Sequence, residues 1–254
     1  MRIVAQTAYR ASDDTSRKGL AYIPDQSAWD CNPSAAYLHY TPNETIDGIE
    51  FFYVPETAGV PLVADMTSMI LSRPIDVSSF GIIYAGAQKN ISQAGLNIVI
   101  IRDDLIKAPL PQTPSLYSYQ LQAEHHSFYN TPPTYAWYLA GLTFAWMKRQ
   151  GGVDYFYEMN KQKANKLYAI IDAHQGFYDC RIDPTCRSMM NVMFYLQTET
   201  LTETFLIEAE KLGLANLRGH RVSGGVRASI YNAMPMAGVD LLADFMIDFV
   251  KRKG

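Results

Sequence analysis

The sequence predicts an α/β fold for the first half of the chain and a smaller α+β domain for the second. Three observations support this. Short apolar runs alternate with loops up to about residue 125, two of these runs are continuously apolar, and helical spacing of apolar residues dominates afterwards. The continuous runs, 81–84 and 97–101, are typical of strands covered on both faces. We therefore expect a sheet with helices on both faces in the first half.

Five apolar runs give the expected strands of the first half: 35–39, 48–54, 61–64, 80–85 and 96–101. A helix over 135–149 follows, with Thr131 as its N-cap and two prolines in its first turn. Gly151-Gly152 then breaks the chain, and we place the domain boundary there. The expected domains are therefore 1–152 and 153–254, and the second has an ordinary size for one domain.

The second domain mixes helices with strands. Its expected elements are a helix over 153–174, a strand over 188–196, a helix over 203–214, a strand over 226–231 and a final helix over 239–250. The final helix carries Leu242, Phe245, Met246 and Phe249 at the spacing of a core-facing stripe. Three basic residues, 251–253, then lie where the helix dipole favours cations. The pattern predicts helices packed on one layer of sheet.

Composition excludes several classes of protein. The 254 residues are 48% hydrophobic and 19% charged, which indicates a soluble globular chain rather than a disordered one. The net charge of -3 gives no basic surface for nucleic acid, and no apolar run approaches the length of about 20 residues that spans a bilayer. The start of the chain has no secretory apolar segment, and the three cysteines are sparse. We expect a cytoplasmic protein with reduced thiols.

Lys89 is the first residue with possible chemistry. It follows the apolar run 80–85 through a segment of small residues, at the end of an expected buried strand. A lysine held in a cleft there is partly desolvated, which favours the neutral amine that imine chemistry requires. The same spacing also fits a surface lysine in a turn.

Asp65 ends the apolar run 61–64. Ligands of open α/β sheets bind at the carboxyl ends of the strands, so a carboxylate there can pair with a protonated ring nitrogen. The alternative role of Asp65 is a cap for the next helix. Since 61–64 and 80–85 should be neighbouring strands, we expect Asp65 and Lys89 to reach one cleft.

Two further segments are suited to anions. Asn130-Thr131 lies at an expected helix N-terminus, where free backbone N–H groups attract anions, although on spacing alone a plain N-cap without a ligand is the simpler interpretation. Arg221 and Arg227 bracket Gly224-Gly225, and a guanidinium binds carboxylate or phosphate with two parallel bonds. Ordinary surface arginines give the same spacing. His125-His126 has no accompanying ligand set, so we expect no metal site.

Together these segments closely resemble the phosphoserine aminotransferase family, from about Ala35 to the end of the chain. The strings that carry the resemblance are His39-Tyr40-Thr41-Pro42-Asn43-Glu44-Thr45-Ile46-Asp47-Gly48, Leu71-Ser72-Arg73-Pro74-Ile75-Asp76-Val77, Gly81-Ile82-Ile83-Tyr84-Ala85-Gly86-Ala87-Gln88-Lys89-Asn90, Asn130-Thr131-Pro132-Pro133-Thr134, Gly219-His220-Arg221 and Arg227-Ala228-Ser229-Ile230-Tyr231-Asn232-Ala233-Met234-Pro235. The resemblance implies a class-V, fold-type I enzyme that uses pyridoxal 5'-phosphate. Its large domain would hold an incomplete mixed sheet with helices on both faces, and its small C-terminal domain would be α+β.

The resemblance also implies an activity. Such an enzyme transfers the amino group of L-glutamate to 3-phosphohydroxypyruvate, giving O-phospho-L-serine and 2-oxoglutarate. It would serve serine biosynthesis and, with a related phosphorylated 2-oxo acid, pyridoxine biosynthesis. The expected partners are these small molecules and a second copy of the chain in a homodimer.

Site roles follow from the resemblance residue by residue. Lys89 resembles the lysine that bonds the cofactor, and the other cofactor-binding positions are Thr45, Asp65, Gln88, Asn130 and Thr131. Of these, Thr45 resembles the partner of the phenolic oxygen and Gln88 a phosphate contact, whereas Asn130 and Thr131 resemble the pair that reaches the phosphate of the other subunit. The substrate-binding positions are His220, Arg221 and Arg227, with Arg227 on the α-carboxylate.

The chain departs from the family at its front, where family members carry about a hundred more residues, enough for a small domain. We therefore expect domain 1–152 to be a truncated cofactor-binding domain. Two functions stand as hypotheses: an active transaminase if a longer chain or a separate fragment supplies the front part, or a non-catalytic remnant that binds a partner through the old dimer surface. An exposed apolar area on the sheet would favour the remnant. A desulfurase is a weaker alternative, because it needs a mobile catalytic cysteine and Cys31, Cys180 and Cys186 are poorly placed.

Overall fold

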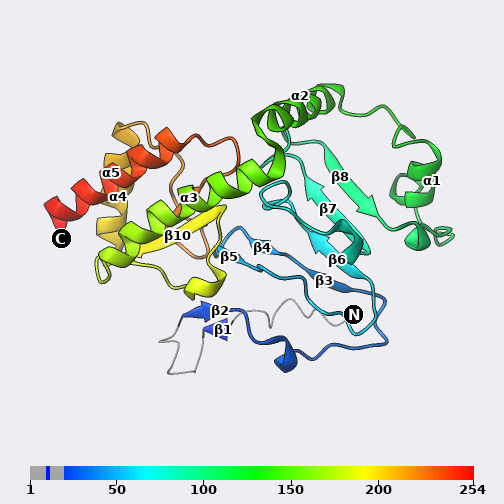
Figure 1. The fold of residues 1–254 in the computed structure, drawn as a ribbon, viewed down its shortest axis with the longest axis horizontal. Helices are drawn as coiled ribbons and strands as arrows, with labels where there is room; N and C mark the ends of the chain where they lie inside the picture. Colours follow the sequence, from blue (N-terminus) through cyan, green and yellow to red (C-terminus); the bar gives the residue numbers. More distant parts are fainter. Residues whose placement is uncertain (1–9, 12–19) are drawn as a thin grey trace.

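The computed structural model describes residues 10–11 and 20–254 (Figure 1). Its first part is built on a four-stranded sheet in the order β3 (Leu38–Tyr40), β6 (Leu62–Asp65), β7 (Ile82–Gly86) and β8 (Asn97–Ile101). The first three strands are parallel, and β8 runs antiparallel to β7. This mixed sheet confirms the predicted α/β class, and β6 and β7 are the neighbours that the sequence predicts.

Short elements complete the first part. β1 (Arg10–Ala11) pairs with β2 (Ala21–Tyr22), and β4 (Asn43–Glu44) pairs with β5 (Ile49–Glu50). The turn between β4 and β5 ends at Gly48, whose φ is +74° and whose missing Cβ would lie 2.6 Å from the carbonyl oxygen of Asn191. Only glycine fits this left-handed turn, which places Thr45 beside the sheet. The 3₁₀ turns are η3 (Gln26–Ala28), η4 (Val77–Ser79), η5 (Asp103–Leu105), η6 (Ser115–Tyr117) and η7 (Pro184–Cys186).

The interpretation of 97–101 as a strand covered on both faces is wrong. β8 is the edge strand, and Val99 and Ile100 keep 38% and 39% of their surface exposed. The run is apolar, but nothing in the described part of the chain covers these two side chains. Continuous hydrophobicity therefore predicts the strand correctly and its coverage incorrectly.

The helix expected over 135–149 is present, but its predicted N-cap is wrong. α1 (Tyr119–Glu124) is short, and α2 (Thr134–Gln150) begins after Pro133, so Thr131 is not its N-cap. The reason lies in the two prolines. Thr131 and Pro132 each precede a proline, which disfavours the helical conformation at both positions. The helix can therefore form only from Thr134 onwards.

Gly151 ends α2 in the left-handed conformation, at φ +116°, and α3 (Gly152–Ala173) begins directly after it. Two hydrophobic clusters lie on either side of this break. One is built from residues of 38–91 with Ala140, and the other from residues of 164–249 with Ile49. These separate clusters are compatible with a boundary at 152, which remains a prediction.

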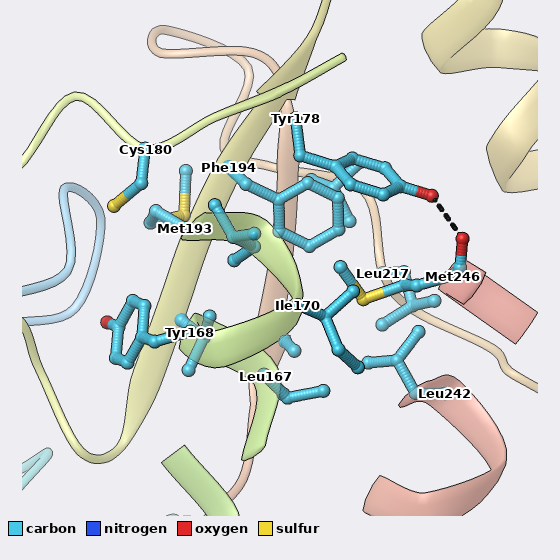
Figure 2. Close-up of a cluster of buried hydrophobic side chains, with 14 of the residues drawn as sticks. Leu167, Tyr168, Ile170, Tyr178, Cys180, Met193, Phe194, Leu217, Leu242 and Met246 are labelled. Atoms are coloured by element: carbon cyan, nitrogen blue, oxygen red, sulfur yellow. Dashed lines mark hydrogen bonds between the residues drawn. The ribbon is translucent and has the colours of Figure 1, made fainter. Parts of the chain in front are cut away.

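The second part packs three helices on an antiparallel sheet in the order β11 (Val226–Ser229), β10 (Asn191–Leu196) and β9 (Tyr178–Asp179). The helices are α3, α4 (Glu199–Lys211) and α5 (Met236–Lys253), and α4 begins four residues earlier than expected because the Thr198 side chain caps it. Leu242, Phe245, Met246 and Phe249 of α5 are buried, as predicted. Figure 2 shows Tyr178 within this core, where its hydroxyl donates a 2.9 Å hydrogen bond to the Met246 carbonyl.

Lys163 of α3 is a buried cation, with 1% of its surface exposed. Its Nζ donates to the carbonyl oxygens of Ile230, Tyr231 and Met234, at 2.9, 2.8 and 3.2 Å. No acidic side chain forms a salt bridge with Lys163 among the described residues. Burial lowers the pKa of Lys163 from 10.5 to about 8.

This shift predicts a pH dependence of stability. Between pH 8 and 10.5 the unfolded chain holds the Lys163 proton and the folded chain does not, so the free energy of unfolding rises with pH over that window. We expect Lys163→Met to lose this rise, and the exposed Lys166→Met to keep it. Urea unfolding at pH 7.5 and pH 10 would measure both. A rise of equal size in Lys163→Met would contradict the assignment.

Candidate active site

Asp65 and Lys89 lie at the carboxyl ends of neighbouring parallel strands. Asp65 is the last residue of β6 and pairs in register with Tyr84 of β7, while Lys89 follows β7 by three residues. The Asp65 carboxylate accepts a 2.9 Å hydrogen bond from the Thr67 backbone N–H, and the Thr67 hydroxyl accepts one of 3.1 Å from the Gly86 N–H. Asp65 therefore caps a turn while its carboxylate stays at the end of the strand.

The Lys89 amine is half-buried and held in place. Its Nζ donates a 2.8 Å hydrogen bond to the Thr45 hydroxyl, which comes from the β4–β5 turn. Burial lowers the pKa of Lys89, the charge of Asp65 raises it, the charge of Arg227 lowers it, and that of Glu44 raises it. These charge effects place all three side chains near the amine. A partly desolvated amine of lowered pKa is a better nucleophile at neutral pH.

Arg227 approaches the same turn from the second part of the chain. It lies in β11, opposite Met193 of β10, and its Nη1 is 3.5 Å from the Thr45 carbonyl oxygen. Its Nε atom is buried and has no hydrogen-bond partner among the described residues. A buried N–H group without an acceptor costs stability, so this donor is available for an anionic ligand.

Two residues of this cluster were missed by the sequence reasoning. Glu44 is half-buried, and its pKa is raised by burial and then by the nearby charges of Asp47 and Asp65. Tyr84 contacts Asp65 across the strand pair. Glu44 directly precedes Thr45, and Tyr84 faces Asp65 once the two strands are aligned. A search along each strand for polar residues on the same face would have found both.

The other cofactor positions are more exposed. Gln88 is exposed, and its side chain folds against Gly86, where an added Cβ would lie 2.4 Å from the Gln88 Oε1 atom. Asn130 and Thr131 are also exposed, and the Asn130 amide donates a 3.2 Å hydrogen bond to the Thr131 carbonyl. Among the described residues, neither Asn130 nor Thr131 forms a hydrogen bond with Lys89.

His220 and Arg221 lie apart from the Lys89 cluster. They line a pocket of about 440 Å³ together with Arg181, Arg218 and Glu203, and neither Lys89 nor Arg227 is among the described residues that line it. Arg218 pairs with Glu203 there. Arg227 is therefore the one predicted substrate residue that the structure brings to the Lys89 amine.

The remaining sequence hypotheses concern metals, membranes and thiols. Within the described residues, no group of three or more His, Cys, Asp and Glu side chains has the arrangement of a metal site. The helices of that same part include none with an apolar stretch that would cross a bilayer. Cys180 and Cys186 are buried, Cys31 is half-buried, and none forms a disulfide.

The structure combines an open mixed sheet with a half-buried lysine and a carboxylate at the strand ends. Comparison with known protein families identifies the class of protein that has this arrangement. Residues 7–242 match the class-V aminotransferase family, so the chain belongs to that family. This match begins at residue 7, before the segment from about Ala35 onwards that carries the motifs.

The similar proteins are phosphoserine aminotransferases. The chain is 56% identical to the "Phosphoserine aminotransferase" of Laribacter hongkongensis (strain HLHK9), over 93% of this chain and 66% of that protein. A solved phosphoserine aminotransferase from Bacillus circulans subsp. alkalophilus superposes with a TM-score of 0.90 at 39% identity, covering 96% of this chain and 67% of that one. A PLP-bound phosphoserine aminotransferase from Trichomonas vaginalis gives 0.84 at 39% identity, covering 89% and 64%. The chain thus spans about two thirds of the length of the curated relatives it matches.

Proposed function

We propose that this chain carries the active-site lysine of a transaminase that uses pyridoxal 5'-phosphate. The enzyme moves the amino group of L-glutamate to 3-phosphohydroxypyruvate and yields O-phospho-L-serine and 2-oxoglutarate. The observation that carries the proposal is the convergence of Thr45, Asp65 and Arg227 on the Lys89 amine. The similarity to phosphoserine aminotransferases supports the choice of substrates.

The residues present fit this cofactor. An amine of lowered pKa suits an aldehyde, a carboxylate suits a protonated ring nitrogen, and the buried Nε atom of Arg227 lacks the acceptor that a substrate carboxylate would supply. In the proposal, Asp65 holds the ring nitrogen, Thr45 holds the phenolic oxygen, and Gln88 contacts the phosphate. When bound, pyridoxal phosphate supplies an aldehyde carbon and a ring that withdraws electrons from the substrate α-carbon.

The chain's own groups perform the remaining tasks. The Lys89 Nζ removes the proton from the substrate α-carbon and delivers it as a general acid. The Asp65 carboxylate keeps a proton on the ring nitrogen by charge attraction. Arg227 orients the substrate through its α-carboxylate, and His220 and Arg221 take the side-chain phosphate or carboxylate.

The proposal includes a homodimer in which Asn130 and Thr131 serve the cofactor phosphate of the partner. Their exposure supports this role. Mixing a Lys89→Ala chain with an Asn130→Ala/Thr131→Ala chain tests it. Each variant alone should be weak, and hybrids should recover about a quarter to a half of the activity because one of their two sites is intact. Hybrids without recovery would count against shared sites.

We also propose the pathways and the compartment in which the enzyme works. The enzyme serves serine biosynthesis in the cytoplasm, and it takes the related phosphorylated 2-oxo acid of pyridoxine biosynthesis as a second acceptor. The exposed Val99 and Ile100 side chains of β8 favour the second candidate function, a non-catalytic remnant that binds a partner through this surface. A chain that binds pyridoxal phosphate but never turns over would support the remnant.

The deciding experiment is an assay of glutamate-dependent amination of 3-phosphohydroxypyruvate by the chain loaded with pyridoxal phosphate. Phosphoserine and 2-oxoglutarate should form in equal amounts. In the reverse reaction, 2-oxoglutarate accepts the amino group of phosphoserine. Replacing 2-oxoglutarate with pyruvate in that reaction tests the specificity for the amino acceptor. Absence of both product formation and cofactor binding would overturn the proposed function.

Arg227→Lys is expected to raise KM for glutamate and for the oxo acid by about a hundredfold, with a smaller change in kcat. A lysine keeps the charge but loses the planar pair of N–H donors that fits a carboxylate. Initial-rate kinetics with both substrates would measure the effect, with Arg221→Lys as the comparison, which should change KM for the phosphorylated substrate most. An unchanged KM in Arg227→Lys would remove Arg227 from the carboxylate site.

A further inference from the structure

His39, Asp65 and Tyr84 lie on one face of the sheet. They come from the adjacent parallel strands β3, β6 and β7, in which His39 pairs with Val63 and Asp65 pairs with Tyr84. Since side chains alternate along a strand, His39, Val63, Asp65 and Tyr84 share a face, and the burial pattern of the three strands agrees. Directly paired side chains on one face are close enough to interact.

The three polar side chains form a hydrogen-bonded chain. The His39 Nε2 atom lies 2.9 Å from the Tyr84 hydroxyl oxygen, and the two rings stack with centroids 5.9 Å apart. Tyr84 is paired in register with Asp65 on the same face, and its pKa is raised by burial, then by the charge of Asp65 and by a hydrogen bond between the two side chains. Tyr84 therefore keeps its proton at neutral pH.

This protonation fixes the direction of every bond in the chain. An ionised carboxylate only accepts, so the Tyr84 O–H donates to Asp65. The Tyr84 oxygen then accepts from His39, which requires a proton on Nε2 of that ring. Asp65 thus receives one hydrogen bond from Tyr84 and one from the Thr67 N–H.

We propose that Tyr84 and His39 are positioning residues that orient the Asp65 carboxylate toward the ring nitrogen of the cofactor. The identity of the ligand in this inference rests on the proposed function, whereas the hydrogen bonds among the three side chains do not depend on it. Tyr84 polarised by His39 is a stronger hydrogen-bond donor than a tyrosine alone, so it fixes the position of the Asp65 carboxylate more firmly. Neither residue touches the reacting atoms, and both act through Asp65.

The first test needs no cofactor. The ¹⁵N chemical shifts of the His39 ring, in the chain as it is, show which nitrogen carries the proton when the ring is neutral. We expect Nε2–H in the unsubstituted chain and a loss of this preference in Tyr84→Phe, which keeps the ring stacked on His39 but removes the acceptor. An Nδ1–H ring in the unsubstituted chain would overturn the inference.

The second test measures the dissociation constant of pyridoxal phosphate by fluorescence titration. Tyr84→Phe should raise it about tenfold, the scale of one hydrogen bond to a charged group. His39→Leu should raise it less, and His39→Gln, which keeps an N–H donor at the position of Nε2, should restore it. Tyr119→Phe removes the hydroxyl of another tyrosine near Tyr84 and should stay within about twofold.

The outcomes separate the two proposals. An unchanged dissociation constant in Tyr84→Phe, while Lys89 still binds the cofactor, would overturn this inference alone. The inference also fails if His39→Gln and His39→Leu weaken binding equally, because a merely structural role would not distinguish them. Failure of the unsubstituted chain to bind pyridoxal phosphate at all would overturn the proposed function, and the positioning role with it.

Discussion

Replacing Lys89 with alanine is expected to abolish covalent attachment of pyridoxal phosphate and to lower transaminase turnover by about 10⁴-fold or more. In the proposed function the amine is both the group that bonds the cofactor and the base that removes the α-proton, and general base catalysis alone accounts for up to about 10⁴. Its 2.8 Å bond to Thr45 and its lowered pKa show an amine prepared for this role.

Borohydride reduction followed by peptide mass spectrometry measures the attachment directly. The reduced cofactor should sit on Lys89 in the unsubstituted chain. Lys89→Arg is the matched control, since it keeps the positive charge but has no nucleophilic amine at neutral pH, and it should lose attachment as completely as Lys89→Ala. Label found instead on an exposed lysine such as Lys166 would show that the cofactor binds elsewhere.

The local part of this site could be predicted from the sequence because it depends on neighbours along the chain. Asp65 and Lys89 each follow an apolar run, and the carboxyl ends of parallel strands meet at one edge of a sheet. Arg227 was suggested because it and Arg221 bracket a Gly-Gly turn, but its approach to Thr45 depends on how β11 packs against the β4–β5 turn. That packing joins residues far apart in the sequence, which no local pattern describes.

The errors have physical causes of the same kind. Thr131 has the residue type of an N-cap, but the prolines at 132 and 133 move the start of α2 to Thr134. The run 97–101 is as apolar as a buried strand, yet β8 lies at the edge of the sheet. Residue type predicts an element well, whereas its boundary and its coverage depend on local sterics and on what packs against it.

Asp65→Asn is expected to lower turnover by about 10³-fold while leaving the fold intact. Asparagine keeps the size of the side chain and can still accept the hydrogen bond from the Thr67 N–H, but it has no charge to keep a proton on the ring nitrogen. A buried charge pair that loses one partner is strongly weakened, by about 3–5 kcal/mol, which corresponds to two to four orders of magnitude. Asp65→Glu should retain more activity, because it restores the charge at a displaced position.

A second effect of Asp65→Asn appears without any cofactor. The Asp65 charge raises the pKa of Lys89, opposing the larger effect of burial, so its removal should lower the Lys89 pKa further. The pH dependence of Lys89 acetylation by acetic anhydride, followed by peptide mass spectrometry, measures this shift. Glu44→Gln gives the matched comparison, since Glu44 acts in the same direction but more weakly, and its effect should be smaller. A Lys89 pKa that rises in Asp65→Asn, or stays the same, would mean that the two side chains do not share a site, and the assignment of Asp65 to the ring nitrogen would fall with it.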